Sequence, residues 1–131
     1  MNKKIFYILP SYNESPNIKP LIKSFYNFYK NKKIIIFIIF VDDGSTDNSL
    51  NILSKIKKQS LKKIKIKVLK HKKNQGLGVA LKTGFNYVLR NANDNDLIVT
   101  MDTDNSHTIK LSYELACEII YKNKDIVIAS R

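Results

Sequence analysis

The stretch Leu97-Ile98-Val99-Thr100-Met101-Asp102-Thr103-Asp104-Asn105-Ser106-His107 joins an apolar run to a polar cluster that holds two aspartates one residue apart. The apolar part is typical of a buried strand, and the polar part is typical of the loop at its carboxyl end. If the backbone stays extended, side-chain alternation places the carboxylates of Asp102 and Asp104 on one side, with their Cα atoms roughly 6 to 7 Å apart. This pair suits one divalent cation, and a solvated acidic loop is the simpler alternative.

Apolar runs and amphipathic stretches alternate along the rest of the chain. The run at 34–41 is apolar on both sides, which is typical of a strand inside a parallel sheet that helices cover. The run at 64–68 alternates with lysine, which indicates an edge strand. The pattern predicts an α/β fold with a doubly wound, mostly parallel sheet and helices on both faces, in which 97–101 is central. Strands are expected at 5–9, 34–41, 64–68, 97–101 and 126–129, and helices at 18–29, 48–58, 79–90 and 109–122.

Length and charge limit the classes of protein. A chain of 131 residues suits one domain, residues 1–131. Its net charge of +12 comes almost entirely from lysine, a bias that AT-rich coding also produces. Ten of the nineteen residues at 55–73 are lysine; a solvated edge explains them, and attraction to an anionic membrane surface is the alternative. Nucleic acid is not an expected partner, because the predicted ligand face carries five acidic residues that repel phosphates.

Targeting signals and cysteine chemistry are absent from the sequence. Cys117 is the single cysteine, which excludes a disulfide within the chain and favours a small core residue. The apolar run near the N-terminus stops at Pro10, so it does not fit a signal peptide. No stretch reaches the roughly 18 apolar residues that a membrane-spanning helix needs. We therefore expect a cytoplasmic protein, with a peripheral position at the inner face of the membrane as a further expectation.

Polar loops follow the predicted strands at 10–17, 42–47, 71–78 and 101–107. In doubly wound sheets, ligands bind beyond the carboxyl ends of the strands. Gly44 suits a turn, and Ser45, Thr46 or Asp47 can cap the helix that follows. Glycines at a helix start also let backbone N–H groups approach a phosphate, although an ordinary loop explains Gly76-Leu77-Gly78 better on the residues alone.

Taken together, these loops resemble the donor-binding half of family 2 glycosyltransferases. The resemblance covers essentially the whole chain, and the Asp-x-Asp-Asn-Ser-His form with a closing Ser-Arg is most similar to dolichyl- or polyprenyl-phosphate mannose and glucose synthases. It implies the GT-A fold, with a Rossmann-like half that binds a nucleotide sugar. The matching segments are Pro-Ser-Tyr-Asn-Glu at 10–14, Val-Asp-Asp-Gly-Ser-Thr-Asp at 41–47, Gly-Leu-Gly-Val-Ala at 76–80, Met-Asp-Thr-Asp-Asn-Ser-His at 101–107 and Asp-Ile-Val-Ile-Ala-Ser-Arg at 125–131.

The resemblance also implies roles for individual residues. Asp42 or Asp43 would hydrogen-bond the base or ribose, and Asp102 and Asp104 would hold the sugar and a Mg²⁺ or Mn²⁺ ion, with Asp104 as the catalytic residue. Ser106 would be a further metal or phosphate contact. Glu14 would line the nucleoside pocket, with helix capping as its alternative role. The remaining substrate-binding residues would be Pro10, Tyr12 and Asn13 at the nucleoside, Gly76, Leu77 and Gly78 at the ribose and diphosphate, and Arg131.

The implied activity is hexosyl transfer from a GDP-mannose or UDP-glucose type of donor to a polyprenyl phosphate or a related acceptor. Family members usually continue beyond the Ser-Arg with an acceptor-binding segment. The alternative is therefore a truncated or split, non-catalytic nucleotide-sugar-binding domain that needs a partner chain. A bacterial receiver domain and a haloacid-dehalogenase-type phosphatase fit poorly, because both place their acidic residues after other strands.

Overall fold

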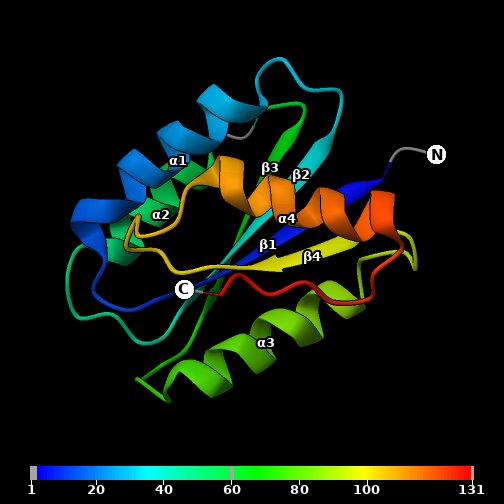
Figure 1. Cartoon of the computed structure of the whole chain (residues 1–131). Helices are drawn as coiled ribbons and strands as arrows, with labels where there is room; N and C mark the ends of the chain where they lie inside the picture. The colour runs from blue at the N-terminus through cyan, green and yellow to red at the C-terminus, as the bar shows by residue number, and fades with distance from the viewer. Residues whose placement is uncertain (1–2, 60, 131) are drawn as a thin grey trace.

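Four parallel strands and four helices alternate along the chain in the computed structural model, which describes residues 3–59 and 61–130. The strand order across the sheet is β3-β2-β1-β4 (Figure 1). This confirms the predicted α/β class and the parallel sheet. The elements are β1 (Lys4–Ser11), α1 (Ser15–Tyr29), β2 (Ile35–Asp42), α2 (Ser49–Lys57), β3 (Ile64–Lys70), α3 (Leu77–Leu89), β4 (Leu97–Thr100) and α4 (Ile109–Lys122).

Helices cover both faces of the sheet, as predicted. Figure 1 shows α1, α2 and α4 on one face and α3 on the other. The core on the first side includes Tyr7, Phe25 and Phe40, and the core beneath α3 includes Phe6 and Val88. Strand β2 lies inside the sheet between these two cores, so its side chains on both faces are buried away from water. This burial explains its unbroken run of apolar residues.

Two expectations about the strands need correction. The strand at 97–101 is not central: β4 has four residues and pairs only with β1, at the edge opposite β3. The segment at 126–129 forms no strand, and the side chains of Ile126 and Ile128 are 78% and 81% exposed. A short apolar run needs a neighbouring strand before it can form a ladder, and none of the described residues pairs with this segment.

Helix starts also differ from the prediction. Helix α1 begins at Ser15 rather than at residue 18, with a proline in its first turn. The first-turn N–H groups of a helix have no intrahelical acceptor, so proline is tolerated there. Helix α3 begins at Leu77, two residues before the predicted start, which brings Gly78 into its first turn.

Two glycines of α3 allow a matched stability test. A Cβ atom at Gly84 would overlap the Cγ2 atom of Ile8 in β1, whereas a Cβ atom at Gly78 meets nothing within 4 Å. We expect Gly84→Ala to lower the free energy of unfolding by about 1 to 3 kcal/mol through overpacking. Gly78→Ala should leave it unchanged or raise it by up to about 1 kcal/mol. Urea unfolding of both variants measures the difference, and equal effects would contradict the close packing of α3 on β1.

Candidate functional site

The loops after β1 and β2 are joined by a side chain that was predicted to contact a nucleoside. Asn13 adopts a left-handed backbone conformation, with φ of 53°. Its Oδ1 atom accepts hydrogen bonds from the backbone N–H groups of Thr46, at 2.8 Å, and Asp47, at 3.2 Å. Its own N–H donates to the Ser45 hydroxyl at 3.0 Å. Asn13 therefore shapes the loop after β2, while its contact with a nucleoside remains a prediction.

Asp47 connects the starts of α1 and α2. Its Oδ2 atom accepts from the backbone N–H of Ser15 at 3.1 Å, and Oδ1 accepts from that of Ser49 at 2.9 Å. Partial desolvation opposes ionisation, but the hydrogen bonds from Ser49 and Ser15 outweigh it and lower the pKa of Asp47 to about 2. The N-cap position of α2 is held by Asn48, whose side chain makes no capping hydrogen bond, so none of Ser45, Thr46 and Asp47 is the N-cap residue as predicted. Of the three, Asp47 accepts the N–H of Ser49, the first residue of the helix.

Lowered carboxylate pKa values predict a loss of stability in acid. The folded chain holds Asp47 at a pKa of about 2, whereas aspartate in an unfolded chain titrates near ~3.9. Between these values the unfolded chain binds more protons, so the contribution is complete above about pH 5 and is lost as the pH falls toward 2. Urea unfolding from pH 7 to pH 2.5 should show this decline, and Asp47→Asn should reduce it. A flat profile in the unmodified chain would contradict the assignment.

Asp42 ends β2 beside Ser11 of β1, its register partner. The Asp42 side chain is fully buried, and its Oδ2 atom accepts from the backbone N–H of Ser45 at 3.0 Å. Among the described residues, neither Asp42 Oδ1 nor the Ser11 hydroxyl has a hydrogen-bond partner. Buried polar atoms without partners are uncommon and costly, so this pair marks a place where a donor group from a ligand would lower the free energy.

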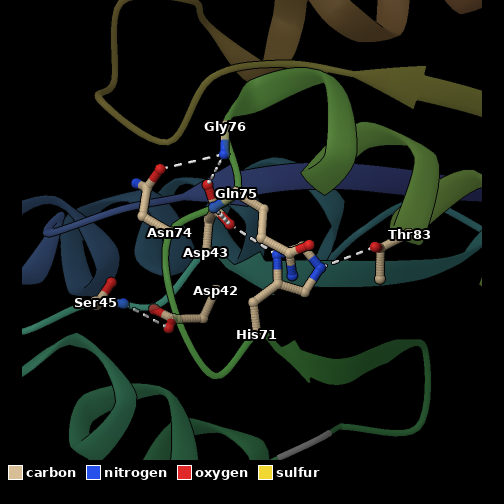
Figure 2. Close-up of polar contacts among 8 residues, drawn as sticks. All are labelled: Asp42, Asp43, Ser45, His71, Asn74, Gln75, Gly76 and Thr83. Carbon is tan, nitrogen blue, oxygen red and sulfur yellow. Dashed lines mark hydrogen bonds and ion pairs between the residues drawn. The ribbon is translucent and has the colours of Figure 1, made fainter.

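Asp43 faces a different set of partners, all in the connection from β3 to α3. Its carboxylate accepts from the backbone N–H groups of Gln75 and Gly76, each at 2.9 Å. The ring of His71 lies between Asp43 and Thr83, with Nδ1 at 2.7 Å from Asp43 Oδ1 and Nε2 at 2.8 Å from the Thr83 hydroxyl (Figure 2). Desolvation raises the pKa of Asp43, but these hydrogen bonds outweigh it and give a net lowering. Asp43 is therefore an ionised acceptor that is already occupied by its own chain.

This network places the start of α3 at the carboxyl edge of the sheet. Gly76 precedes the helix with φ of 93°, a backbone conformation in which a residue with a side chain would be strained. Gly44, with φ of 73°, lies so close to the backbone of Lys73 and Asn74 that a Cβ atom would overlap both residues. The first-turn N–H groups of α3 thus stand beside the loop that follows β2, in an arrangement that suits an anion.

The two aspartates after β4 both point away from the core. Asp102 and Asp104 are exposed, and Thr103 between them is 2% exposed, with its hydroxyl donating to the carbonyl oxygen of Pro10 at 2.6 Å. Hydrogen bonds from the side chain and the N–H of Ser106 lower the pKa of Asp104, partial desolvation opposes them, and nearby His107 lowers it further. The exposures alternate from 102 to 104, but β4 ends at Thr100 and the backbone bends at 103–105, so the placement of both carboxylates on one side stays a prediction.

These residues fit a divalent cation only if other groups complete its coordination. Among residues 3–59 and 61–130, no group of three or more His, Cys, Asp and Glu side chains could hold a metal ion. His107 Nε2 lies 3.9 Å from Asp102 Oδ2, a contact that is an ion pair only when the imidazole is protonated. Mg²⁺ is usually held by one or two carboxylates, with water and phosphate oxygens at its other positions. Asp102 and Asp104 fit that pattern.

The other predicted residues lie in the same loops, with one outside the described residues. Tyr12 is 45% exposed, and Pro10 is half-buried at the end of β1. Glu14 stands at the N-cap position of α1 without capping its backbone, and its Oε2 atom accepts from the side chain of Asn17 at 2.6 Å. Leu77 is 59% exposed in the first turn of α3. Arg131 lies outside the described residues.

Sequence reasoning missed three residues that hold these loops. Thr103 fastens the loop after β4 to β1, and His71 and Thr83 support Asp43. The inward position of Thr103 could have been inferred from the alternation that places the flanking aspartates outside. The pairing of His71 with Asp43 joins residues 28 positions apart, for which the sequence gives no local signal.

Comparisons with known proteins agree with this arrangement. The chain is 32% identical to the UDP-N-acetylglucosamine-dolichyl-phosphate N-acetylglucosaminyltransferase of Methanococcus voltae, over 99% of this chain and 53% of that enzyme. It is 34% identical to the dolichyl-phosphate beta-glucosyltransferase of Saccharomyces cerevisiae, over 62% of this chain and 25% of that protein. The chain thus spans about half the length of the first relative and a quarter of the second.

Solved structures and family models give the same result. The crystal structure of residues 1–349 of TarS from S. aureus in complex with UDP superposes with a TM-score of 0.65 and 25% identity, covering 93% of this chain and 33% of TarS. Residues 7–131 match the model of glycosyl transferase family 2. Four loops that converge at the carboxyl edge of a parallel sheet, with this match across nearly the whole chain, establish that the chain belongs to glycosyl transferase family 2.

Proposed function

We propose that the chain forms the donor-binding half of a glycosyltransferase that moves a sugar from a nucleoside diphosphate to a polyprenyl phosphate. The observation that carries this proposal is the convergence of Asp42, the start of α3 and the Asp102–Asp104 pair at one edge of the sheet. Relatives named as dolichyl- and undecaprenyl-phosphate transferases support the acceptor class. UDP bound to TarS and the UDP-sugar in the name of the M. voltae relative favour a uridine donor.

Each part of the site has a separate task in this proposal. Asp42 accepts a hydrogen bond from the base or ribose, and the first turn of α3 faces the ribose and diphosphate. Asp102 and Asp104 would hold Mg²⁺ or Mn²⁺, and the ion would supply positive charge that stabilises the leaving diphosphate. The acceptor's phosphate oxygen forms a bond to the anomeric carbon as the bond from that carbon to the diphosphate oxygen breaks, and the electron pair leaves with the nucleoside diphosphate. Because the acceptor is already anionic, the reaction needs no strong protein base.

A second candidate is the same donor site in a chain that needs a partner chain for the acceptor. The exposed Ile126 and Ile128 favour it, because two isoleucine side chains near 80% exposure gain by contact with another surface. The two candidates share the donor site and differ in whether the chain alone transfers sugar. Among residues 3–59 and 61–130, no helix combines the length and apolarity that crossing a bilayer requires. Residence at the membrane surface is part of the proposal for both candidates.

The donor site is tested by calorimetric titration of the chain with UDP-N-acetylglucosamine, UDP-glucose, GDP-mannose and ATP, each with Mn²⁺ and with a chelator. We expect binding of a sugar nucleotide that depends on the metal, and no binding of ATP. Transfer to a short polyprenyl phosphate, measured in the same sample, separates the two candidates. If no sugar nucleotide binds to a well-folded chain, the proposed donor site is wrong.

Asp42→Asn tests the base contact. The amide keeps the size of the carboxylate and an oxygen for the N–H of Ser45, but it presents an NH₂ group where the ligand's donor would approach. We expect the affinities for UDP and for the UDP-sugar to fall by similar factors, on the order of 10- to 100-fold. Titration with both ligands measures this, and a loss confined to the UDP-sugar would contradict the contact with the nucleoside.

A further inference from the structure

The outer face of the helix layer carries a groove between α1 and α2, the two helices that lie side by side in Figure 1. It has a volume of about 460 Å³ and is distinct from the loops of the donor site. Isoleucine side chains supply its apolar part, and exposed lysines surround them. The lining residues are Lys19, Ile22, Lys23 and Tyr26 of α1 with Asn48, Ile52, Lys55, Ile56 and Gln59 of α2 and its flanks.

The charge of this groove is not balanced by the chain itself. Three of its lining residues are lysines and none is an aspartate or a glutamate. Lys19, Lys23 and Lys55 make no ion pair with any residue that the structure describes, unlike Lys110 and Lys122 of α4, which pair with Glu114 and Glu118. Clustered cations without a counter-charge repel one another, and an anionic partner relieves that repulsion.

The distribution of charge along the chain points the same way. Residues 48–93 contain eleven lysines and one arginine but no aspartate or glutamate. Coding bias can raise the number of lysines, but it does not explain why the acidic residues are excluded from this part of the chain. Lys55 of this segment lines the groove and Lys57 and Lys58 follow it at the end of α2, whereas Lys67 of β3 lies over the ring of Tyr87 on the α3 face. The cations nearest the groove therefore come from α1 and the end of α2.

We propose that the groove between α1 and α2 docks the chain on a bilayer surface that contains anionic phospholipids. Lysines that surround an aliphatic floor suit this partner, because their stems lie along apolar groups while their ammonium groups reach phosphates. Single-stranded nucleic acid is favoured instead by several aromatic stacking platforms. This groove is lined by three isoleucines and one aromatic residue, Tyr26, whose hydroxyl donates to the carbonyl oxygen of Gln59 at 3.1 Å.

The position of the groove agrees with the proposed acceptor. Asn48 lines the groove, and the preceding residue, Asp47, holds the loops of the donor site. Docking through the groove therefore brings the carboxyl edge of the sheet close to the lipid surface, where a polyprenyl phosphate resides. The proposal rests on the proposed function only for this consequence, because binding to lipid can be measured without any donor.

Flotation with vesicles tests the proposal. We expect the chain to bind vesicles of phosphatidylcholine with 30% phosphatidylglycerol and not to bind vesicles of pure phosphatidylcholine. It should dissociate from the anionic vesicles as the salt concentration rises. The triple variant Lys19→Gln/Lys23→Gln/Lys55→Gln should lose roughly 100-fold in partitioning. The control Lys82→Gln/Lys110→Gln/Lys124→Gln removes the same charge from α3, α4 and the segment after α4, and it should lose several-fold less.

Equal losses in the two triple variants would overturn the proposal, and so would equal binding to neutral vesicles. It would also be overturned if the groove variant lost binding to single-stranded RNA while its vesicle binding persisted. Because the replaced lysines are all exposed, both variants should fold normally, which urea unfolding verifies. UDP-sugar titration of the same samples keeps the two proposals apart. Vesicle binding without donor binding would remove the proposed function alone, and donor binding without vesicle binding would remove the docking surface alone.

Discussion

Asp104→Ala is expected to abolish metal-dependent binding of the sugar nucleotide, with at least a roughly 100-fold loss of affinity in the presence of Mn²⁺. The structure offers no third His, Cys, Asp or Glu among the described residues to replace the lost carboxylate. The lowered pKa of Asp104 means that this carboxylate is ionised at neutral pH, as a metal ligand must be. Calorimetric titration of the variant with the UDP-sugar, with Mn²⁺ and with a chelator, measures the loss.

The design of this test separates loss of a ligand from loss of the fold. Because Asp104 is exposed, the free energy of unfolding of Asp104→Ala should differ from that of the unmodified chain by no more than about 0.5 kcal/mol. Asp125→Asn removes an equally exposed carboxylate outside the candidate site and should leave donor binding unchanged. Unchanged affinity in Asp104→Ala with Mn²⁺ present would show that the pair of aspartates holds no metal for the donor.

Asp43→Ala should have the largest effect on stability, about 3 to 5 kcal/mol. The Asp43 and His71 side chains are 6% and 9% exposed, so the variant leaves a buried imidazole without its carboxylate. It also removes the acceptor of the Gln75 and Gly76 N–H groups. Such a loss is a large fraction of the 5 to 15 kcal/mol typical of a domain. Urea unfolding measures it.

Two milder variants keep this prediction testable if Asp43→Ala does not fold. Thr83→Val removes only the hydroxyl that contacts His71 Nε2 and should cost about 1 to 2 kcal/mol. Asp47→Ala removes the exposed carboxylate that accepts the N–H of Ser49, the first residue of α2, and should cost about 1 kcal/mol. If Asp43→Ala costs no more than Asp47→Ala, the buried network contributes less to stability than its geometry implies.

The contrast between Asp42 and Asp43 shows where sequence reasoning ends. The two carboxylates are adjacent after the same strand, so the prediction treated them as alternatives for one role. In the structure Asp42 is buried with one oxygen unpartnered, and Asp43 is occupied by His71 and the start of α3. The difference comes from partners 28 to 33 residues away along the chain, which no local pattern specifies.

The strands give a second contrast. The run at 34–41 was predicted correctly as an interior strand, because burial on both faces demands apolar residues at every position. The run at 126–129 is also apolar, yet it forms no strand among the described residues. Its Ile126 and Ile128 have the right composition, but a strand also requires a neighbouring backbone to bind.

Hydrophobic periodicity and the order of motifs are local properties of the chain, and from them follow the α/β class, the parallel sheet, the loops that carry the acidic residues and the family. Packing between distant segments is needed to know which carboxylate oxygens lack a partner within the described residues, where β4 lies in the sheet, and that lysines of α1 and α2 share one groove. Those features depend on contacts between segments far apart along the chain, and they exist only once the helices and strands have packed together.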